Sequence, residues 1–169
     1  MSLPPFDTVV RQHGGVVLRV CRAVLPPADA DDAWSTTFLA ALEAYPRLTP
    51  DSNVRGWLVT IAHRKAIDVA RAAARAPSPV DDRSRTASAA THRAPGADAF
   101  IESHDGDLWN AVRRLPVKQR HAVAYHHVGG LPYVDVGELL GCSTEAARRS
   151  ASDGISSLRR TLTRKPVDP

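Results

Sequence analysis

The stretch LPYVDVGELLGCSTEAARRSASDGISSLRRTL, residues 131–162, predicts the fold of the carboxyl-terminal half of the chain. Pro132 suits the first position of a helix. Four apolar residues then fall on one face of that helix: Tyr133, Val136, Leu139 and Leu140. Gly141 ends the helix, and Ser143 can cap the next one. The pattern predicts a helix-turn-helix.

The second helix of this motif has an apolar face and a polar face. Small or apolar residues recur every three or four positions: Ala147, Ala151, Ile155, Leu158 and Leu162. This spacing leaves other residues facing outward: Arg148, Arg149, Ser152 and Asp153. Such a helix is available to the DNA major groove, where Arg pairs with phosphates or with guanine edges. An exposed Arg is also often only solvated, so the motif alone leaves both interpretations open.

The rest of the chain predicts an all-α protein of two small helical domains joined by a flexible linker. Residues 1–75 have helix-period apolar residues, with breaks at Pro26-Pro27 and between Pro46 and Pro50. Residues 106–165 add two short helices before the helix-turn-helix. Residues 76–105 hold three prolines, many small polar residues and no apolar period. A coil of that length spans about 30 Å, so the two domains could lie one or two DNA turns apart.

Composition and charge exclude several classes of protein. The start of the chain has no signal-peptide pattern, and no stretch is apolar enough to span a bilayer, so a soluble, cytoplasmic protein is expected. Cys21 and Cys142 are too few and too far apart for a disulfide framework or a sulfur-based metal site. No catalytic motif accompanies the seven histidines, so neither an enzyme nor a cofactor is expected.

Charge is distributed unevenly, with a net charge of +4. Residues 28–32 are acidic, whereas residues 52–75 hold five Lys or Arg against one acid, Asp68. An acidic surface followed by a basic surface is compatible with a basic protein partner and a nucleic acid.

Three strings in order resemble the extracytoplasmic-function sigma factors of bacteria. DADDAWSTTFLAAL (Asp29–Leu42) is similar to the family's acidic helix, which docks on the polymerase clamp helices. NVRGWLVTIAHRKAIDVAR (Asn53–Arg71) resembles the helix that reads and opens the minus-ten element. LPVKQRHAVAYHHVGGLPYVDVGELLGCS (Leu115–Ser143) resembles the domain that reads the minus-thirty-five element. The implied domains are region 2 (1–75), a variable linker (76–105) and region 4 (106–165).

The resemblance implies roles for individual residues. The polymerase-binding set is Asp29, Asp31, Asp32, Ser35 and Thr36. The DNA-binding set in region 2 is Asp51, Ser52, Asn53, Arg55, Trp57, His63, Arg64, Lys65 and Arg71. The DNA-binding set in region 4 is Ser143, Thr144, Glu145, Arg148, Arg149 and Ser152. Trp57 is equally compatible with a position in the core. The acidic run is also compatible with an ordinary solvated start of a helix. Phe38 and Leu39 are expected to lie in the core.

The sequence also departs from the family pattern. Ser35 and Thr36 stand where a Gln and an acid are common, which puts polymerase affinity in doubt. In the recognition helix, Ser150, Asp153 and Gly154 occupy positions where Arg or a helix-favouring residue is common. Gly costs about 0.5 to 1 kcal/mol inside a helix. Either the promoter is unusual or this domain has drifted to another task.

The expected function is that of a sigma factor, which directs RNA polymerase to specific promoters in a stress or signal response. Its expected partners are core RNA polymerase, promoter DNA and an anti-sigma factor that clamps the two domains or covers the acidic helix, with no membrane insertion. One alternative is a DNA-binding regulator that works without polymerase. Such a regulator binds operators as the free protein, usually as a dimer. A protein-interaction module derived from a sigma factor is a further alternative.

Overall fold

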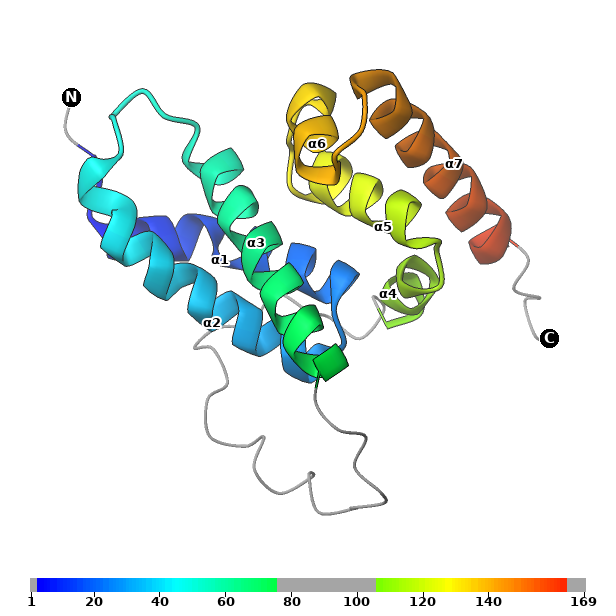
Figure 1. Cartoon of the computed structure of the whole chain (residues 1–169), viewed down its shortest axis with the longest axis horizontal. Helices are drawn as coiled ribbons and strands as arrows, with labels where there is room; N and C mark the ends of the chain where they lie inside the picture. The colour runs from blue at the N-terminus through cyan, green and yellow to red at the C-terminus, as the bar shows by residue number, and fades with distance from the viewer. Residues whose placement is uncertain (1–2, 76–105, 164–169) are drawn as a thin grey trace, which may run out of the picture.

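The computed structural model describes residues 3–75 and 106–163, and the first of these ranges is a bundle of three long helices (Figure 1). These are α1 (Phe6–Val24), α2 (Pro27–Ala44) and α3 (Val54–Arg75), with a single 3-10 turn, η1 (Tyr45–Arg47), after α2. The helix breaks predicted at Pro26-Pro27 and from Pro46 onward are confirmed. Proline has no amide hydrogen and fixes its own φ, so it begins helices more easily than it continues them.

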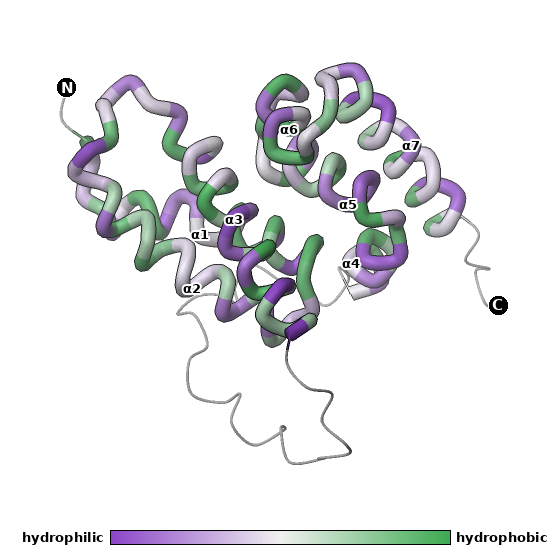
Figure 2. Tube along the Cα trace, in the orientation of Figure 1, coloured by the Kyte–Doolittle hydropathy of each residue, from purple (hydrophilic) through white to green (hydrophobic). Residues whose placement is uncertain are grey.

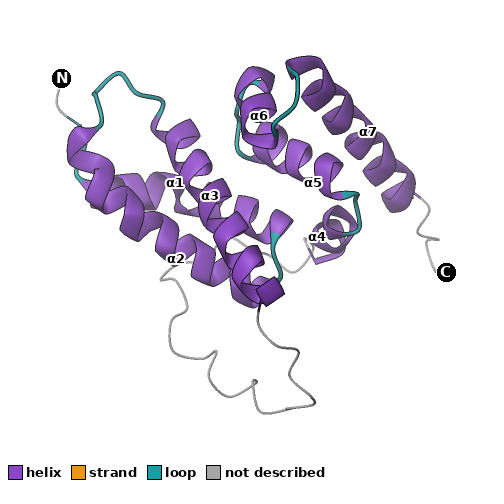
Figure 3. Cartoon of the chain, viewed as in Figure 1, coloured by secondary structure: helices purple, strands orange, loops and turns teal. Residues whose placement is uncertain are grey.

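The second range holds the helix-turn-helix and the helices that precede it. They are α4 (Gly106–Arg113), α5 (Val117–Val123), the π-helical turn η4 (Ala124–Val128), α6 (Tyr133–Leu140) and α7 (Thr144–Thr163). Neither described range contains a β-strand (Figure 3), which confirms the all-α prediction. The linker predicted over residues 76–105 lies outside the described residues, and the domain boundaries stay predictions.

The core of the first domain is closed by aromatic residues at one end. Phe6 of α1 contacts the rings of Phe38 and Tyr45, at centroid distances of 6.3 and 5.2 Å. The ring of Trp34 lies 4.8 Å from that of Phe38. Leu58 of α3 is fully buried in the same core. Each of the three helices thus buries apolar residues in this core, and polar and apolar residues alternate along the tube of Figure 2.

The turn between α6 and α7 has the predicted chemistry. Gly141 adopts a left-handed φ of 64°, a conformation that favours glycine, and ends α6. The Ser143 hydroxyl accepts a hydrogen bond of 3.1 Å from the amide of Ala146 and so caps α7. Gly137 lets α6 approach this turn, because a Cβ there would lie 2.8 Å from the Cys142 carbonyl oxygen. Pro132 precedes the first residue of α6 instead of occupying it.

Gly154 has a packing role that the sequence did not predict. It is buried in α7, and a Cβ there would lie 2.7 Å from Cγ2 of Val123 and 3.3 Å from the carbonyl oxygen of Gln119. The glycine therefore allows α5 and α7 to pack closely, and it is no sign of a drifting domain. Leu162, expected on the apolar face, is 42 % exposed and is not part of this core.

The two domains pack against each other. Helix α1 contacts α4, α5 and η4. Val20 and Ala23 of α1 and Val59 of α3 belong to the same buried cluster as Tyr125 and Leu131 of the second domain. The sequence predicts two domains joined by a linker. The contact between the domains places predicted DNA-binding residues of α3 against the second domain.

Candidate polymerase-binding and nucleic-acid interfaces

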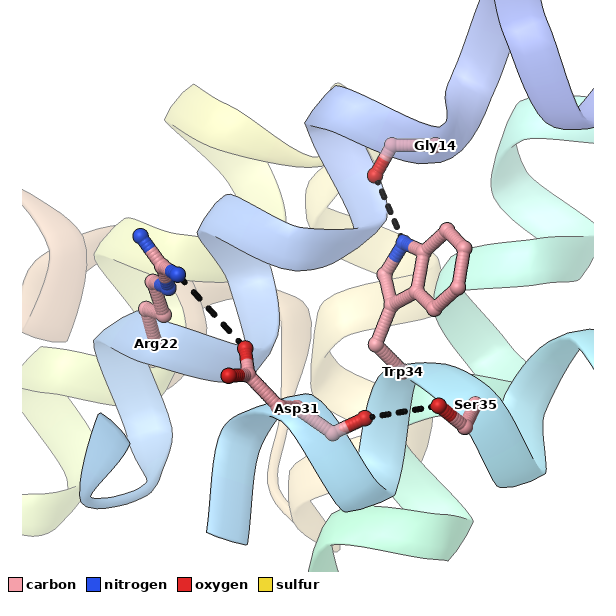
Figure 4. A network of polar contacts seen from close by, with 5 residues as sticks. All are labelled: Gly14, Arg22, Asp31, Trp34 and Ser35. Carbon is pink, nitrogen blue, oxygen red and sulfur yellow. Dashed lines mark hydrogen bonds and ion pairs between the residues drawn. The ribbon is translucent and has the colours of Figure 1, made fainter. Parts of the chain in front are cut away.

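The acidic start of α2 is only partly available to a partner. Asp31 forms an ion pair with Arg22 of α1, with 3.5 Å between Nη2 and Oδ1 (Figure 4). Asp29 is half-buried, whereas Asp32 is exposed. Of the three carboxylates, Asp32 is thus the most accessible to a basic partner.

The two residues that depart from the family pattern satisfy their hydroxyl groups within α2. Ser35 donates to the carbonyl of Asp31 at 3.1 Å, and Thr36 donates to the carbonyl of Asp32 at 2.9 Å. Beside them, the indole nitrogen of Trp34 donates to the carbonyl of Gly14 at 2.9 Å, which fixes α2 on α1 (Figure 4). Thr36 remains exposed, so its contact with polymerase stays a prediction.

Helix α2 also exposes two leucines that the sequence interpretation missed. Leu39 is 63 % exposed and Leu42 is 51 % exposed. The expectation that Leu39 is core is therefore wrong, while that for Phe38, which is buried, is correct. Leu39 lies seven positions after Asp32, two helical turns along the same face, and this spacing is the signal that could have placed it outside.

The loop before α3 is held by short-range hydrogen bonds. The amide of Ser52 donates to the carbonyl of Thr49 at 3.0 Å, and the two hydroxyl groups of these residues lie 2.8 Å apart. The Asn53 side chain accepts from the amide of Gly56 at 3.0 Å and caps α3. Asp51 and Asn53 are exposed, so the loop presents polar groups at the amino terminus of α3.

Trp57 lies against the core of the first domain and is half-buried. Its ring centroid is 6.4 Å from that of Tyr45. The structure thus gives this residue a packing role on one side and leaves part of its surface accessible.

The basic residues predicted to contact DNA divide into two groups along α3. Arg64 and Arg71 are exposed, and Lys65 is half-buried. Arg55 and His63 instead contact the second domain: Arg55 donates to the carbonyl of Val128 at 2.7 Å, and His63 is buried. In this conformation His63 cannot reach DNA, and its predicted role requires the domains to separate.

In the second domain, the predicted DNA-binding residues form one exposed surface over the first turns of α7. The exposed members are Ser143, Thr144, Glu145, Arg148, Arg149 and Ser152. Arg148 is oriented from two sides: its Nη1 lies 3.2 Å from the Glu145 carboxylate, and its guanidinium is 5.5 Å from the centroid of the Tyr133 ring. Tyr133 in turn stacks on His126 at 3.7 Å. The column His126–Tyr133–Arg148 connects η4, α6 and α7.

The histidines that the structure describes take part in no cluster suited to a metal ion. Across residues 3–75 and 106–163, no group of three or more His, Cys, Asp or Glu side chains is placed to bind one. Burial lowers the pKa of His121 to about 4, helped by the nearby charges of Arg120 and His63. Burial also raises the pKa of the Cys21 thiol to about 12.

Within residues 3–75 and 106–163, none of the helices combines the length and the apolar character that a bilayer span requires.

Comparisons with known proteins agree with this arrangement. Residues 9–76 match the family model "Sigma-70 region 2", and residues 105–158 match "Sigma-70, region 4". The chain is 32 % identical to RNA polymerase sigma factor CarQ of Myxococcus xanthus, over 93 % of this chain and 88 % of CarQ. It is 26 % identical to the ECF RNA polymerase sigma factor SigK of Mycobacterium tuberculosis, over 93 % of this chain and 83 % of SigK.

Among solved structures, the fold resembles sigma factor RpoE of Bartonella quintana in its complex with the anti-sigma factor NepR. The TM-score is 0.68 at 17 % sequence identity, over 95 % of this chain and 98 % of RpoE. The two matched regions, in the order and at the positions of the two helical domains, agree with the relatives found by sequence. The chain belongs to the extracytoplasmic-function sigma factors, which direct RNA polymerase to promoters.

Proposed function

We propose that this sigma factor docks on core RNA polymerase through the exposed face of α2. Five exposed residues share that face: Asp32, Thr36, Leu39, Leu42 and Glu43. The exposure of two large leucines beside two carboxylates is the observation that supports this proposal. Apolar residues supply binding energy at a protein interface, and carboxylates select a basic partner. The acidic surface is thus more than a solvated helix start.

The DNA-binding roles are assigned to both domains. The loop with Asp51, Ser52 and Asn53, followed by α3, engages the minus-ten element, where polar groups and cations suit an unstacked strand. The exposed start of α7 reads the minus-thirty-five element, with Arg148 and Arg149 toward the major groove. Such a protein is not itself an enzyme, and it acts in the cytoplasm together with polymerase.

An anti-sigma factor is proposed as a further partner. RpoE, whose fold this chain shares, was solved in complex with the anti-sigma factor NepR. The exposed leucines of α2 form an apolar surface that an inhibitor can cover in competition with polymerase.

The test measures binding to bacterial core RNA polymerase by the fluorescently labelled full chain. The double variant Leu39→Ser, Leu42→Ser removes the apolar part of the face, and we expect at least tenfold weaker binding, since each buried leucine is worth about 1.5 kcal/mol or more. Leu162→Ser is the matched control, because Leu162 is also exposed but lies at the end of α7. Equal affinity of the double variant and wild type would reject docking through this face.

The polymerase-independent regulator predicts a different outcome. In that case core polymerase would not bind the chain at all, and the free protein would bind duplex DNA with high affinity. The same titration, repeated with duplex promoter fragments and no polymerase, separates the two functions.

A further inference from the structure

Two aromatic rings of the second domain support one arginine of the predicted DNA-binding surface. The ring of Tyr133, the first residue of α6, stacks on that of His126 at 3.7 Å, with 17° between the two planes. The guanidinium of Arg148 lies over the Tyr133 ring, 5.5 Å from its centroid. Arg148 belongs to the predicted DNA-binding set, whereas His126 and Tyr133 do not. The column therefore connects two residues without an assigned role to one with a predicted role.

His126 is fixed to the backbone that joins η4 to α6. Nδ1 of His126 lies 2.7 Å from the carbonyl oxygen of Leu131. A carbonyl oxygen only accepts hydrogen bonds, so Nδ1 carries the proton and donates it. The amide of Leu131 donates to the carbonyl of Tyr125, and the amide of Gly130 donates to the carbonyl of His126, both at 3.0 Å. The ring at the base of the column is thus held by its side chain and by its backbone.

The π-helical turn η4 gives His126 its position. The amide of Gly129 donates to the carbonyl of Ala124, five residues earlier, at 2.8 Å. A π turn holds more residues than an α-helical turn and so changes the direction in which its side chains leave the helix. Such turns are rare, and they occur frequently at functional sites. The turn in this chain brings the His126 ring to the start of α6, where Tyr133 stacks on it.

Arg148 has one further contact, which is too weak to orient it alone. Its Nη1 lies 3.2 Å from the carboxylate of Glu145, and both side chains are more than half exposed. Water screens an ion pair of this kind, so the pair restrains the guanidinium little. The flat Tyr133 ring adds a surface against which a planar guanidinium packs. A guanidinium restrained in this way loses less conformational freedom on binding, which favours a directional contact with a base edge.

We propose that His126 and Tyr133 are positioning residues for promoter specificity: the column holds Arg148 so that its guanidinium reads one base pair of the minus-thirty-five element. Guanine is the matching base, because its O6 and N7 accept two hydrogen bonds from one guanidinium. Arg149, the exposed neighbour outside the column, contacts the DNA backbone. The inference rests on the proposed function for the reading of this element by α7.

The test is a selection of promoter sequences by reconstituted holoenzyme. A genomic fragment that wild type transcribes is randomised over its minus-thirty-five element, and the bound sequences are determined. Wild type should prefer guanine at one position on the order of tenfold, and Arg148→Ala should lose this preference. Tyr133→Leu should lower it about two- to fivefold. Arg149→Ala is the matched control, which should weaken binding to all sequences without relaxing this position.

Two substitutions of His126 separate a positioning role from a purely structural one. His126→Phe keeps a ring for Tyr133 to stack on but removes the hydrogen bond to Leu131. His126→Asn keeps a side-chain donor for that bond but removes the ring. We expect His126→Phe to retain the guanine preference and His126→Asn to lower it about two- to fivefold, as Tyr133→Leu does. The reverse order, or an equal loss of affinity for every sequence in both variants, would overturn the proposal. Circular dichroism confirms that each variant folds.

A second measurement observes the column in the free, full-length chain without DNA. Nuclear Overhauser contacts between the Tyr133 ring and the Arg148 side chain should be present in wild type and in His126→Phe, and weaker in His126→Asn. Their absence in wild type would overturn the positioning role even if α7 reads the element. A wild type that shows the contacts but prefers no base in the selection would instead reject the reading of the element by α7, which belongs to the proposed function.

Discussion

Nδ1 of His63 in α3 lies 2.7 Å from the hydroxyl of Tyr125 in η4, 62 positions later in the chain. This hydrogen bond joins the two domains at a point where both side chains are buried. A buried donor or acceptor that loses its partner costs about 1–3 kcal/mol. The pair is therefore sensitive to any change in the protonation of His63.

Acid is expected to destabilise the folded chain. Burial lowers the pKa of His63, and the nearby Arg64 lowers it further, whereas the Leu139 backbone partly opposes this. Burial also lowers the pKa of His121, whose ring lies 5.6 Å from that of Tyr125, to about 4. Because the unfolded chain takes up these protons near pH 6.5 and the folded chain does not, the free energy of unfolding is highest above pH 6.5 and declines as pH falls toward 4.

Thermal unfolding followed by circular dichroism between pH 7.5 and 4.5 checks this expectation. The loss should be on the order of 1–3 kcal/mol over that range. In His121→Phe, which removes one titrating group and keeps a ring, the loss should be smaller. A stability that rises on acidification would contradict the assignment of neutral, buried histidines.

Gly154→Ala is expected to destabilise the second domain, although alanine favours helices. The new Cβ would lie 2.7 Å from Cγ2 of Val123. Overpacking of this kind costs about 1–3 kcal/mol and exceeds the gain of about 0.5–1 kcal/mol in helix propensity. Denaturant unfolding should show the loss, which Val123→Ala in the same chain should partly restore. Ser156→Ala, exposed on the same helix, should change stability by less than about 0.5 kcal/mol.

Tyr133 is expected to orient Arg148 for DNA. Loss of the ring in Tyr133→Leu removes a cation–π contact worth about 0.5–1 kcal/mol, so holoenzyme should bind promoter fragments about two- to fivefold more weakly. Tyr133→Phe keeps the ring face and should bind like wild type. Equal losses in both variants would show that the hydroxyl, and not the ring, is what matters.

Substitutions at the neighbouring residues Asp31 and Asp32 are expected to have different effects on stability and on polymerase binding. Asp31→Asn breaks the ion pair with Arg22, which is partly exposed, and should lower stability by up to about 1 kcal/mol. Asp32→Asn should leave stability unchanged and weaken binding to core polymerase. Paired chemical unfolding and polymerase titrations check this. If Asp32→Asn lowers the free energy of unfolding and Asp31→Asn does not, the result would contradict the exposed position of Asp32 and the ion pair of Asp31.

Local signals in the sequence were sufficient for most of the fold. Pro26-Pro27 and Gly141 end or begin helices through their own backbone chemistry, and Ser143 caps its helix with its own hydroxyl. Each of these effects acts over a few residues, so no knowledge of the tertiary structure is needed. The apolar periods identified the three helices of the first domain for the same reason.

The features that the sequence does not predict, such as the burial of Gly154 and His63, depend on tertiary packing. Gly154 resembles a defect until α5 is placed against it, and Leu39 resembles core until the direction of the α2 face is known. The burial of His63 depends on a residue 62 positions away. No periodicity within either domain encodes the surface on which the other domain lies, so local pattern does not predict the contact between the domains.

If this chain docks on core polymerase through α2 as proposed, transcription initiation depends on the exposed face of that helix. The most direct measurement is run-off transcription by reconstituted holoenzyme on genomic promoter fragments, comparing wild type with an Asp32→Asn, Leu39→Ser double variant. We predict discrete transcripts with wild type and a loss of at least tenfold in the variant. Transcripts of equal yield from both proteins would contradict docking through α2. No transcript with wild type, while core polymerase is active with another sigma factor, would contradict its role in initiation.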